Sequence, residues 1–507
     1  MTTTRRCNIL WGLPVTLALI LAFWVLGAGG AARVAWLQLL GAAVIPLLVL
    51  RRPGPDSQDT STRTILLLSL AFVALAALSL VTSTNWGITA GAVATLAAGV
   101  ALMHAASLVP RRAAAMLIAT QVVFVAPIAV SAILEPLGGG WLAPHDYYPG
   151  RAMANMGGPG PLGALLAAVT PVAAAFFLAS SKRTLSILCG VAVALMIAAL
   201  TATFSRAALL ATVMGLVTVV AILVRAGGFD ASGEQGLRLR RRVVRRALVV
   251  VAMAILIVLV YNGIVRRHAP SDFAIGVRPG TQTFEFARQI EGTELTNVEV
   301  RVLCWGTALG TISRSPLTGV GAGCFSVASE GLIQDGLKRV AAARGLVYEF
   351  AYNDYLQMGA ELGIPALAVF ISLLVVILLS ARSACRRQAG ELLREPLRVA
   401  AGAGVLGALS ALLAQAFVDF PLHLPSHQTL LWVNLGLLTA LANPRVASAT
   451  EPVATRTPLR RLAAALAVLV AAAMATVGIR GILAERSAVE AVRLHELEDW
   501  EEALELA

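Results

Sequence analysis

Charge is scarce in this sequence. Only 13% of its 507 residues are charged, whereas 58% are hydrophobic and the mean hydropathy is +0.79. A water-soluble domain carries about a quarter charged residues, so this composition excludes a soluble globular protein. The apolar runs are continuous over about 20 residues and do not alternate in polarity, which excludes a transmembrane β-barrel. We therefore expect an all-α, polytopic bundle of membrane-spanning helices.

Lysine and cysteine are also rare. Lys182 and Lys338 are the only lysines, so the net charge of +12 comes almost entirely from arginine. The five cysteines form no Cys-x-x-Cys motif and no Cys/His metal spacing, and we predict neither a metal nor a cofactor. Cys304 and Cys324 share one polar segment and form either a disulfide or two free buried thiols. No patch of interleaved aromatic and basic residues is present, which argues against nucleic-acid binding.

Apolar windows of membrane-crossing length predict about 12–13 transmembrane helices. Their approximate ranges are 8–27, 31–50, 64–82, 86–109, 113–134, 161–180, 184–203, 205–224, 245–265, 354–381, 396–417, 426–443 and 462–482. We divide the chain into amino-terminal helices (1–150), a core with a large polar loop at 266–352 (151–443), a last span (444–482) and an amphipathic tail (483–507). The tail is similar to the opening of a tetratricopeptide repeat, and a simple surface helix is the alternative.

The basic clusters predict the orientation of the bundle. They lie on alternate loops, as the positive-inside rule requires of cytoplasmic loops. The loops that fall on the opposite side are 135–160, 205–206, 266–353 and 419–423. Four arginines lie on that side, where the rule predicts few: Arg151, Arg206, Arg301 and Arg314. Because an arginine at the edge of lipid is costly without a partner, we expect an outward-facing cluster that binds an anion.

Three polar segments carry the candidate chemistry. They are Ser205-Arg206 at the start of a span, Arg301 and Trp305 followed by the turn Ser315-Pro316-Leu317-Thr318-Gly319-Val320-Gly321, and Tyr352-Asn353-Asp354-Tyr355-Leu356-Gln357 followed by Glu361. A glycine-rich turn can present N–H groups to phosphate, but this one lacks the Lys-Ser/Thr of a nucleotide loop, and we predict no ATP site. Asp354, Gln357 and Glu361 are spaced to share one helical face.

In this order and topology, the three segments resemble the O-antigen ligase and O-antigen polymerase family of bacterial membrane glycosyltransferases. A later run also looks like that family: Asp419-Phe420-Pro421-Leu422-His423-Leu424-Pro425. Each motif is weak alone, and the resemblance rests on the ordered set around one large loop, over about residues 150–443. It implies a multi-pass protein of the bacterial inner membrane whose large loop is periplasmic.

The resemblance also implies a reaction. A glycan is transferred from undecaprenyl pyrophosphate to a glycan, lipid or protein acceptor, with inversion of the anomeric centre and without metal or nucleotide. The lipid pyrophosphate leaves, so arginines are expected to neutralise its growing charge. By resemblance Arg206 and Arg301 take this role. Arg314, Arg151 and Asn353 are the further candidates for substrate binding.

One position departs from the family pattern. Family members usually have a histidine directly before the asparagine of this motif, regarded as the base that activates the acceptor hydroxyl, and this sequence has Tyr352 there. A tyrosine with a pKa of about 10 is a poor base at neutral pH. Either another group is the base, or the acceptor needs no strong base, or the protein only binds lipid-linked glycan. The candidate catalytic residues are Tyr352, Glu349, Asp354 and His423, with Asp419 as a further candidate base.

Two other classes of function are alternatives to an enzyme. A transporter or flippase for lipid-linked sugars requires paired polar groups near the middle of the membrane and inverted repeats, and the sequence shows no clear repeat. A non-catalytic scaffold is favoured by the substitution at Tyr352 and by the repeat-like tail. The single large polar loop favours the enzyme, because loops carry function on rigid scaffolds.

Overall fold

The computed structural model describes residues 3–25, 31–50, 60–142, 151–229, 234–268, 297–333, 335–338, 349–387, 396–442, 465–480 and 483. Within these ranges every regular element is a helix, so the predicted all-α class is confirmed. Of the predicted loop 266–352, the described parts are 266–268, 297–333, 335–338 and 349–352. The predicted repeat-like tail at 484–507 lies outside the described residues.

Nine of the described helices are long and apolar enough to cross a membrane. They are α3 (Thr60–Leu78), α4 (Trp86–Ser107), α5 (Arg111–Leu134), α6 (Pro159–Ala179), α7 (Arg183–Thr203), α8 (Arg206–Phe229), α9 (Glu234–His268), α14 (Ile364–Arg387) and α16 (Pro396–Gln415). Three shorter apolar helices are also described. Trp11–Trp24 lies within α1 (Thr3–Ile20) and η1 (Leu21–Val25), and Val34–Val49 lies within α2 (Ala31–Leu50). The third is Ala465–Arg480. A further helix, α17 (Pro425–Ala442), is largely buried. The chain is a multi-pass helical membrane protein.

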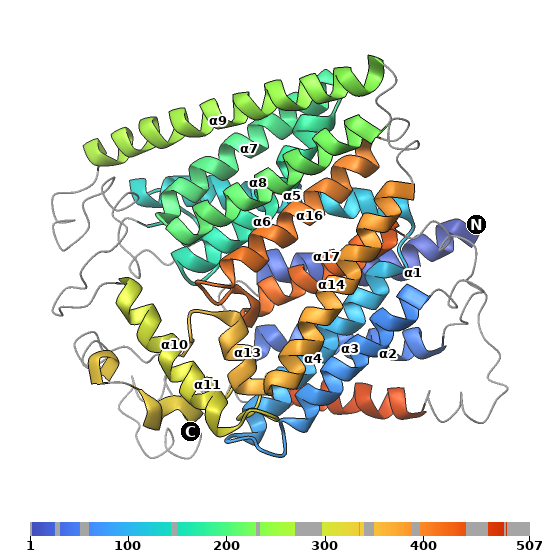
Figure 1. Ribbon diagram of the computed structural model, residues 1–507, viewed down its shortest axis with the longest axis vertical. Coiled ribbons are helices and arrows are strands. Elements are labelled where there is room, and N and C mark those ends of the chain that lie inside the picture. Colours follow the sequence, from blue (N-terminus) through green and yellow to red (C-terminus); the bar gives the residue numbers. More distant parts are fainter. Residues whose placement is uncertain are drawn as a thin grey trace.

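Helix α6 is the central element of the bundle. It packs against α7, α8 and α16, and 94% of its apolar window is buried. Glycines bring these helices together: a Cβ at Gly215 of α8 or Gly407 of α16 would lie 2.5 or 2.8 Å from the side chain of Pro171. Small residues allow such close approach of helix backbones in lipid. In contrast, only 11% of the corresponding window of α9 is buried, and α9 lies outside α7 and α8 (Figure 1).

The remaining spans form a second group beside this core. Within it α17 packs against α4, α14 against α3, and α2 against α4 (Figure 1). Three aromatic rings pack at its centre. The ring centroids are 5.6 Å apart for Phe72 and Phe370, 6.0 Å for Phe72 and Trp432, and 6.2 Å for Phe370 and Trp432. Helices α5 and α16 contact α17 and so join the two groups.

The two ends of α6 differ in their chemistry. At the carboxyl end, Arg246 of α9 donates hydrogen bonds to the carbonyl oxygens of Phe177 and Ser180, at 2.6 and 2.8 Å. At the amino end, Nε2 of His427 donates to the carbonyl oxygen of Pro161 at 2.9 Å. Arg246 belongs to a basic cluster that is predicted to be cytoplasmic. The end of α6 near Pro161 therefore corresponds to the opposite side of the predicted topology.

The polar loop packs onto a sharp break between two helices. The sequence predicts one span over 354–381, whereas the structure has α13 (Asp354–Leu362) and α14, separated at Gly363. Gly363 has a φ of +85°, and a Cβ there would lie 2.4 Å from the carbonyl oxygen of Leu317. Opposite it, a Cβ at Gly319 would lie 2.2 Å from the carbonyl oxygen of Glu361. We call Gly319 and Gly363 the glycine corner.

Backbone hydrogen bonds close the glycine corner. The N–H of Ile364 donates to the carbonyl of Pro316 at 2.8 Å, and the N–H of Gly321 donates to that of Glu361 at 3.0 Å. The segment that forms this contact follows α10 (Asn297–Arg314) and continues into α11 (Phe325–Ser329) and η5 (Glu330–Leu332). Helix α10 itself packs against α13 (Figure 1). The described part of the loop is thus fixed to the helix that carries Asp354.

We expect the change Gly363→Ala to destabilise the protein by about 2–4 kcal/mol, because an L residue with left-handed φ is strained and the new Cβ overlaps a carbonyl oxygen. Thermal unfolding in detergent micelles measures this as a lower midpoint. Gly402→Ala in α16 is the matched control, since a Cβ there meets no atom within 4 Å. Equal midpoints for the two variants would contradict the role of the glycine corner.

Candidate functional site

Helix α13 begins at a junction of chain segments. Asn353 is its N-cap, and its side-chain oxygen accepts hydrogen bonds from two backbone N–H groups of the first turn, both at 3.0 Å. The amide nitrogen of Asn353 donates to the carbonyl oxygen of Phe417 at 3.1 Å, and the N–H of Asp354 donates to that of Ala416 at 2.8 Å. Asn353 therefore ties the start of α13 to the end of α16.

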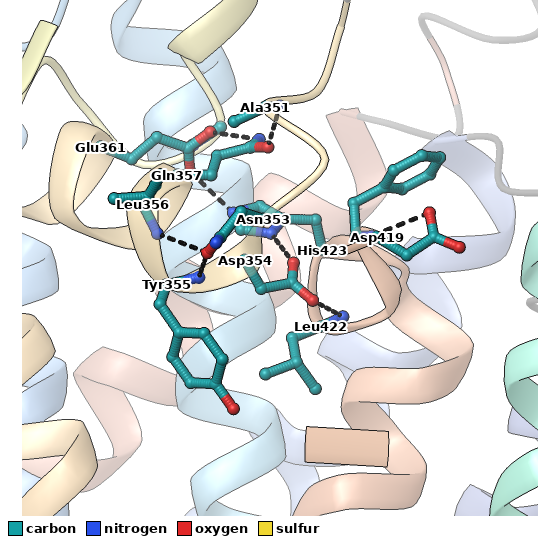
Figure 2. A network of polar contacts seen from close by, with 12 residues as sticks. Ala351, Asn353, Asp354, Tyr355, Leu356, Gln357, Glu361, Asp419, Leu422 and His423 are labelled. Carbon is teal, nitrogen blue, oxygen red and sulfur yellow. Dashed lines mark hydrogen bonds and ion pairs between the residues drawn. The ribbon is translucent and has the colours of Figure 1, made fainter. Parts of the chain in front are cut away.

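A histidine lies between two carboxylates at this junction (Figure 2). Asp354 and Glu361 come from α13, and His423 comes from the short helix η6 (Pro421–His423). Nδ1 of His423 bonds to Oδ1 of Asp354, and Nε2 lies 3.5 Å from Oε2 of Glu361. The exposed fractions of the Asp354, Glu361 and His423 side chains are 0%, 5% and 14%. We call these three residues the carboxylate–histidine triad.

Further hydrogen bonds hold both carboxylates of the triad. The N–H of Leu422 donates to Oδ2 of Asp354 at 2.8 Å. Glu361 accepts from the N–H of Gly323 at 2.8 Å and from Nε2 of Gln357 at 3.0 Å. Helix α13, helix η6 and the turn after α10 are therefore joined through one polar network.

The triad carries charge at neutral pH. Burial alone would lower the pKa of His423, but the charge of Glu361 and the hydrogen bond to Asp354 raise it to about 10. Burial raises the pKa of Asp354 to about 6, against the hydrogen bond and charge of His423. Burial also acts to raise the pKa of Glu361, but the charge of His423 holds it below its usual value. At pH 7 an imidazolium lies between two carboxylates.

A third buried carboxylate, Asp419, lies at the same junction and is 7% exposed. Its Oδ2 accepts from Nε2 of Gln415 at 3.2 Å, and its Oδ1 accepts from the N–H of Phe420 at 3.1 Å. Burial raises the pKa of Asp419, and the charges of Arg301 and Arg151 act to lower it. Among the described residues, buried Nε of Arg301 and buried Oε1 of Gln415 have no hydrogen-bond partner.

Tyr352 contacts Arg301 through its ring. The guanidinium carbon lies 5.7 Å from the ring centroid, within the range of a cation–π interaction. The same ring meets Phe420 edge-on at 5.3 Å, and Phe420 stacks on Phe350 at 4.0 Å. The backbone of Tyr352 has a φ of 53°, and its carbonyl oxygen accepts from the indole of Trp305 at 3.1 Å. Tyr352 therefore places an aromatic surface against an arginine.

The structure brings some of the predicted arginines together. Nε of Arg151 donates to the carbonyl oxygen of Thr203 at 3.0 Å, just before Arg206 begins α8. Arg314 is exposed at the opposite end of α10 from Arg301, about 20 Å along the helix at 1.5 Å per residue. Glu349 is also exposed. Arg151 and Arg206 thus lie close together where α7 ends and α8 begins, whereas Arg314 lies at the other end of α10 from Arg301.

Gln415 is a residue of this junction that was not predicted from the sequence. It is 1% exposed and is the last residue of α16, four residues before Asp419. A buried amide at the end of an otherwise apolar span is a signal that the sequence contains, since such a group needs polar partners.

Two other questions from the sequence concern cysteine and metal. Cys304 and Cys324 are both buried and free, which decides between the two alternatives in favour of free thiols. Burial raises the pKa of Cys304 to about 12, so this thiol is protonated at neutral pH. Within the part of the chain that the structure describes, no group of three or more His, Cys, Asp or Glu side chains is arranged to hold a metal ion.

Comparison with known proteins identifies part of the chain. Residues 191–371 match the family model described as O-Antigen ligase. The matched range includes Arg206, Arg301 and the triad carboxylates, whereas Asp419 and His423 follow it. A search of curated proteins finds no match. The resemblance predicted from the sequence is confirmed over this segment, and with it an O-antigen ligase or polymerase type of function in general.

Proposed function

We propose that this membrane protein, whose residues 191–371 match the O-antigen ligase family model, transfers a glycan from undecaprenyl pyrophosphate to a hydroxyl acceptor at the periplasmic face of the bacterial inner membrane. The observation that carries the proposal is a cluster in which Arg301 contacts the ring of Tyr352, that ring meets Phe420, and the buried carboxylate Asp419 directly precedes Phe420. Asp419 lies at the amino end of α6, opposite to the end bonded by Arg246, since a Cβ at Gly160 would lie 3.4 Å from its Oδ2. Cations at that side fit an anionic substrate that enters from the outer leaflet.

The arginines suit a pyrophosphate leaving group. As the bond to the sugar breaks, negative charge grows on the pyrophosphate, and fixed guanidinium groups stabilise it in a site that excludes water. Nε of Arg301 has a buried N–H without a partner among the described residues, and a phosphate oxygen would satisfy it. The pyrophosphate bond supplies the energy of transfer, so the reaction requires no nucleotide.

A transfer assay tests the proposed function. The purified protein in nanodiscs receives a synthetic polyprenyl pyrophosphate oligosaccharide and a glycan acceptor, and the release of free polyprenyl pyrophosphate is followed. We expect release that depends on the acceptor. Movement of the intact donor between leaflets without release would instead favour a flippase. Donor binding with neither outcome would favour a non-catalytic scaffold.

The role of Tyr352 leads to a separate prediction. We expect Tyr352→Phe to keep transfer within about threefold of the wild type, because the ring that contacts Arg301 and Phe420 is retained. Tyr352→Ala removes this ring and is expected to lower the rate at least tenfold, since a misplaced charge loses much of its effect on the transition state. Initial rates at saturating donor measure both. Loss of activity in Tyr352→Phe would show that the hydroxyl takes part.

A further inference from the structure

We infer that Asp419 and Gln415 form the binding site for an acceptor sugar, in which Asp419 is the general base of the transfer. The inference rests on the proposed function. Asp419 would accept the proton of the acceptor hydroxyl, since Tyr352 stands where the family usually has its histidine base. The acceptor would be a sugar with neighbouring hydroxyl groups.

The carboxylate–histidine triad is not available for this task. Both ring nitrogens of His423 face a carboxylate, so a protonated His423 has no lone pair with which to accept a proton. Asp354 and Glu361 in turn are bonded to His423 and to backbone N–H groups. The triad joins segments of the chain and leaves the proton transfer to another group.

Asp419 differs from the triad carboxylates in its partners. Each of its oxygens accepts one hydrogen bond from the described residues, from Gln415 and from the N–H of Phe420. A carboxylate can accept about four hydrogen bonds, so capacity for a substrate hydroxyl is left. Asp419 directly precedes Phe420, whose ring meets that of Tyr352, and the Tyr352 ring contacts Arg301. The base and an arginine that would receive the leaving group therefore belong to one cluster.

The oxygen of Gln415 indicates the kind of acceptor. While Asp419 is ionised, its carboxylate fixes Nε2 of Gln415 towards itself, because the reversed amide would set two acceptor oxygens against each other. Oε1 of Gln415 then points away from Asp419, buried and without a donor among the described residues. A hydroxyl that gives its proton to Asp419 cannot also donate to this oxygen. A second hydroxyl on the adjacent carbon of a sugar ring can.

The step balances without any further reactant. The acceptor hydroxyl loses its proton to the carboxylate of Asp419, and its oxygen forms the new bond to the anomeric carbon. The bond between that carbon and the pyrophosphate oxygen breaks, and its electron pair stays on the pyrophosphate. The products are the glycoside, polyprenyl pyrophosphate with one more negative charge, and a protonated Asp419 that later releases its proton to water.

Asp419→Asn tests the base directly. We expect this variant to bind polyprenyl pyrophosphate oligosaccharide as tightly as the wild type and to lose transfer by about 10²–10⁴-fold, the usual contribution of a general base. Asp335→Asn, which alters an exposed carboxylate paired with Lys338, is the matched control and is expected to be fully active. In Asp419→Ala, added formate is expected to restore part of the rate, which a purely structural role would not allow.

The pH dependence gives a second readout. Burial raises the pKa of Asp419, and the base works only when ionised, so transfer by the wild type is expected to fall as the pH drops through that pKa. The residual rate of Asp419→Asn is expected to lack this fall.

Acceptor analogues test the part of Gln415. Deoxy acceptors that each lack one hydroxyl are compared in the wild type and in Gln415→Leu. We expect the analogue that lacks the hydroxyl bonded to Gln415 to be a poor acceptor for the wild type. Gln415→Leu is expected to use this analogue and the complete sugar equally well. Gln121→Leu, which removes a buried amide bonded to Asn434, is the control and is expected to keep the preference.

The outcomes separate the two levels of the proposal. A wild type that releases polyprenyl pyrophosphate together with an Asp419→Asn variant within threefold of it would overturn the base and leave the transferase in place. Loss of donor binding in Asp419→Asn would also overturn it, since Asp419 would then be structural. A protein silent with every sugar acceptor would overturn both.

Discussion

Arg301→Ala is expected to lower glycan transfer by at least about 100-fold and to weaken binding of polyprenyl pyrophosphate. Arg301 is the predicted arginine whose buried Nε has no hydrogen-bond partner among the described residues, and its guanidinium contacts the ring of Tyr352. Loss of one fixed group that stabilises transition-state charge costs about 10²–10³-fold in rate. The measurement is the release of free polyprenyl pyrophosphate at saturating acceptor.

The chain supplies a matched control for this variant. Arg314 lies at the other end of the same helix, α10, and is exposed. Arg314→Ala removes the same charge from the molecule and is expected to change the rate by less than threefold. Equal losses in the two variants would mean that overall charge, and not a site at Arg301, attracts the donor. Full activity in Arg301→Ala would remove Arg301 from the site.

His423→Gln is expected to destabilise the protein by about 3–5 kcal/mol, because it leaves the two buried carboxylates of the triad without their cation. A lower midpoint of thermal unfolding in detergent measures the effect at pH 7. Adding Asp354→Asn and Glu361→Gln to the same chain removes the unpaired charges and is expected to recover part of the loss. A midpoint for His423→Gln equal to that of the wild type would contradict the charged triad.

The same triad predicts a dependence on pH. The pKa of His423 is raised from 6.5 to about 10, so its stabilisation is fully present below pH 6.5 and is lost as the pH rises through about 10. The unfolding midpoint of the wild type is therefore expected to fall over this interval. In His423→Gln this part of the fall is expected to be absent.

Much of the fold follows from hydrophobic length alone. Each predicted span contains a helix in its described part, because a run of about 20 apolar residues in lipid can satisfy its backbone only as a helix. Hydrophobic length does not predict the break between α13 and α14 at Gly363. Gly363 and Pro365 together are a helix-breaking signal, because Pro365 has no N–H for the carbonyl of Glu361, which accepts from Gly321 instead. The contact of this break with Leu317, which is distant along the chain, is not contained in the local pattern.

The sequence predicted those features of the candidate site that depend on residues close together along the chain. The helical period placed Asp354 and Glu361 on one face of α13, and the structure has them there around His423. The pairing with His423 itself depends on how η6 packs against α13, which residue spacing does not contain. Arg314 was predicted to bind substrate because the positive-inside rule assigns it to the same side of the membrane as the other three arginines. That rule does not predict how far apart residues lie on one side.

The burial of α6 has a mechanical consequence. Transport by alternating access needs two halves that rock against each other about a central site. Helix α6 is packed against α8 and α16 with glycines at the contacts, and its two ends are held by Arg246 and His427. Rocking would have to separate these backbones and break both attachments. Such a core favours a fixed frame over a rocking bundle, and under the proposed function the lipid-linked donor diffuses to the site along the bilayer.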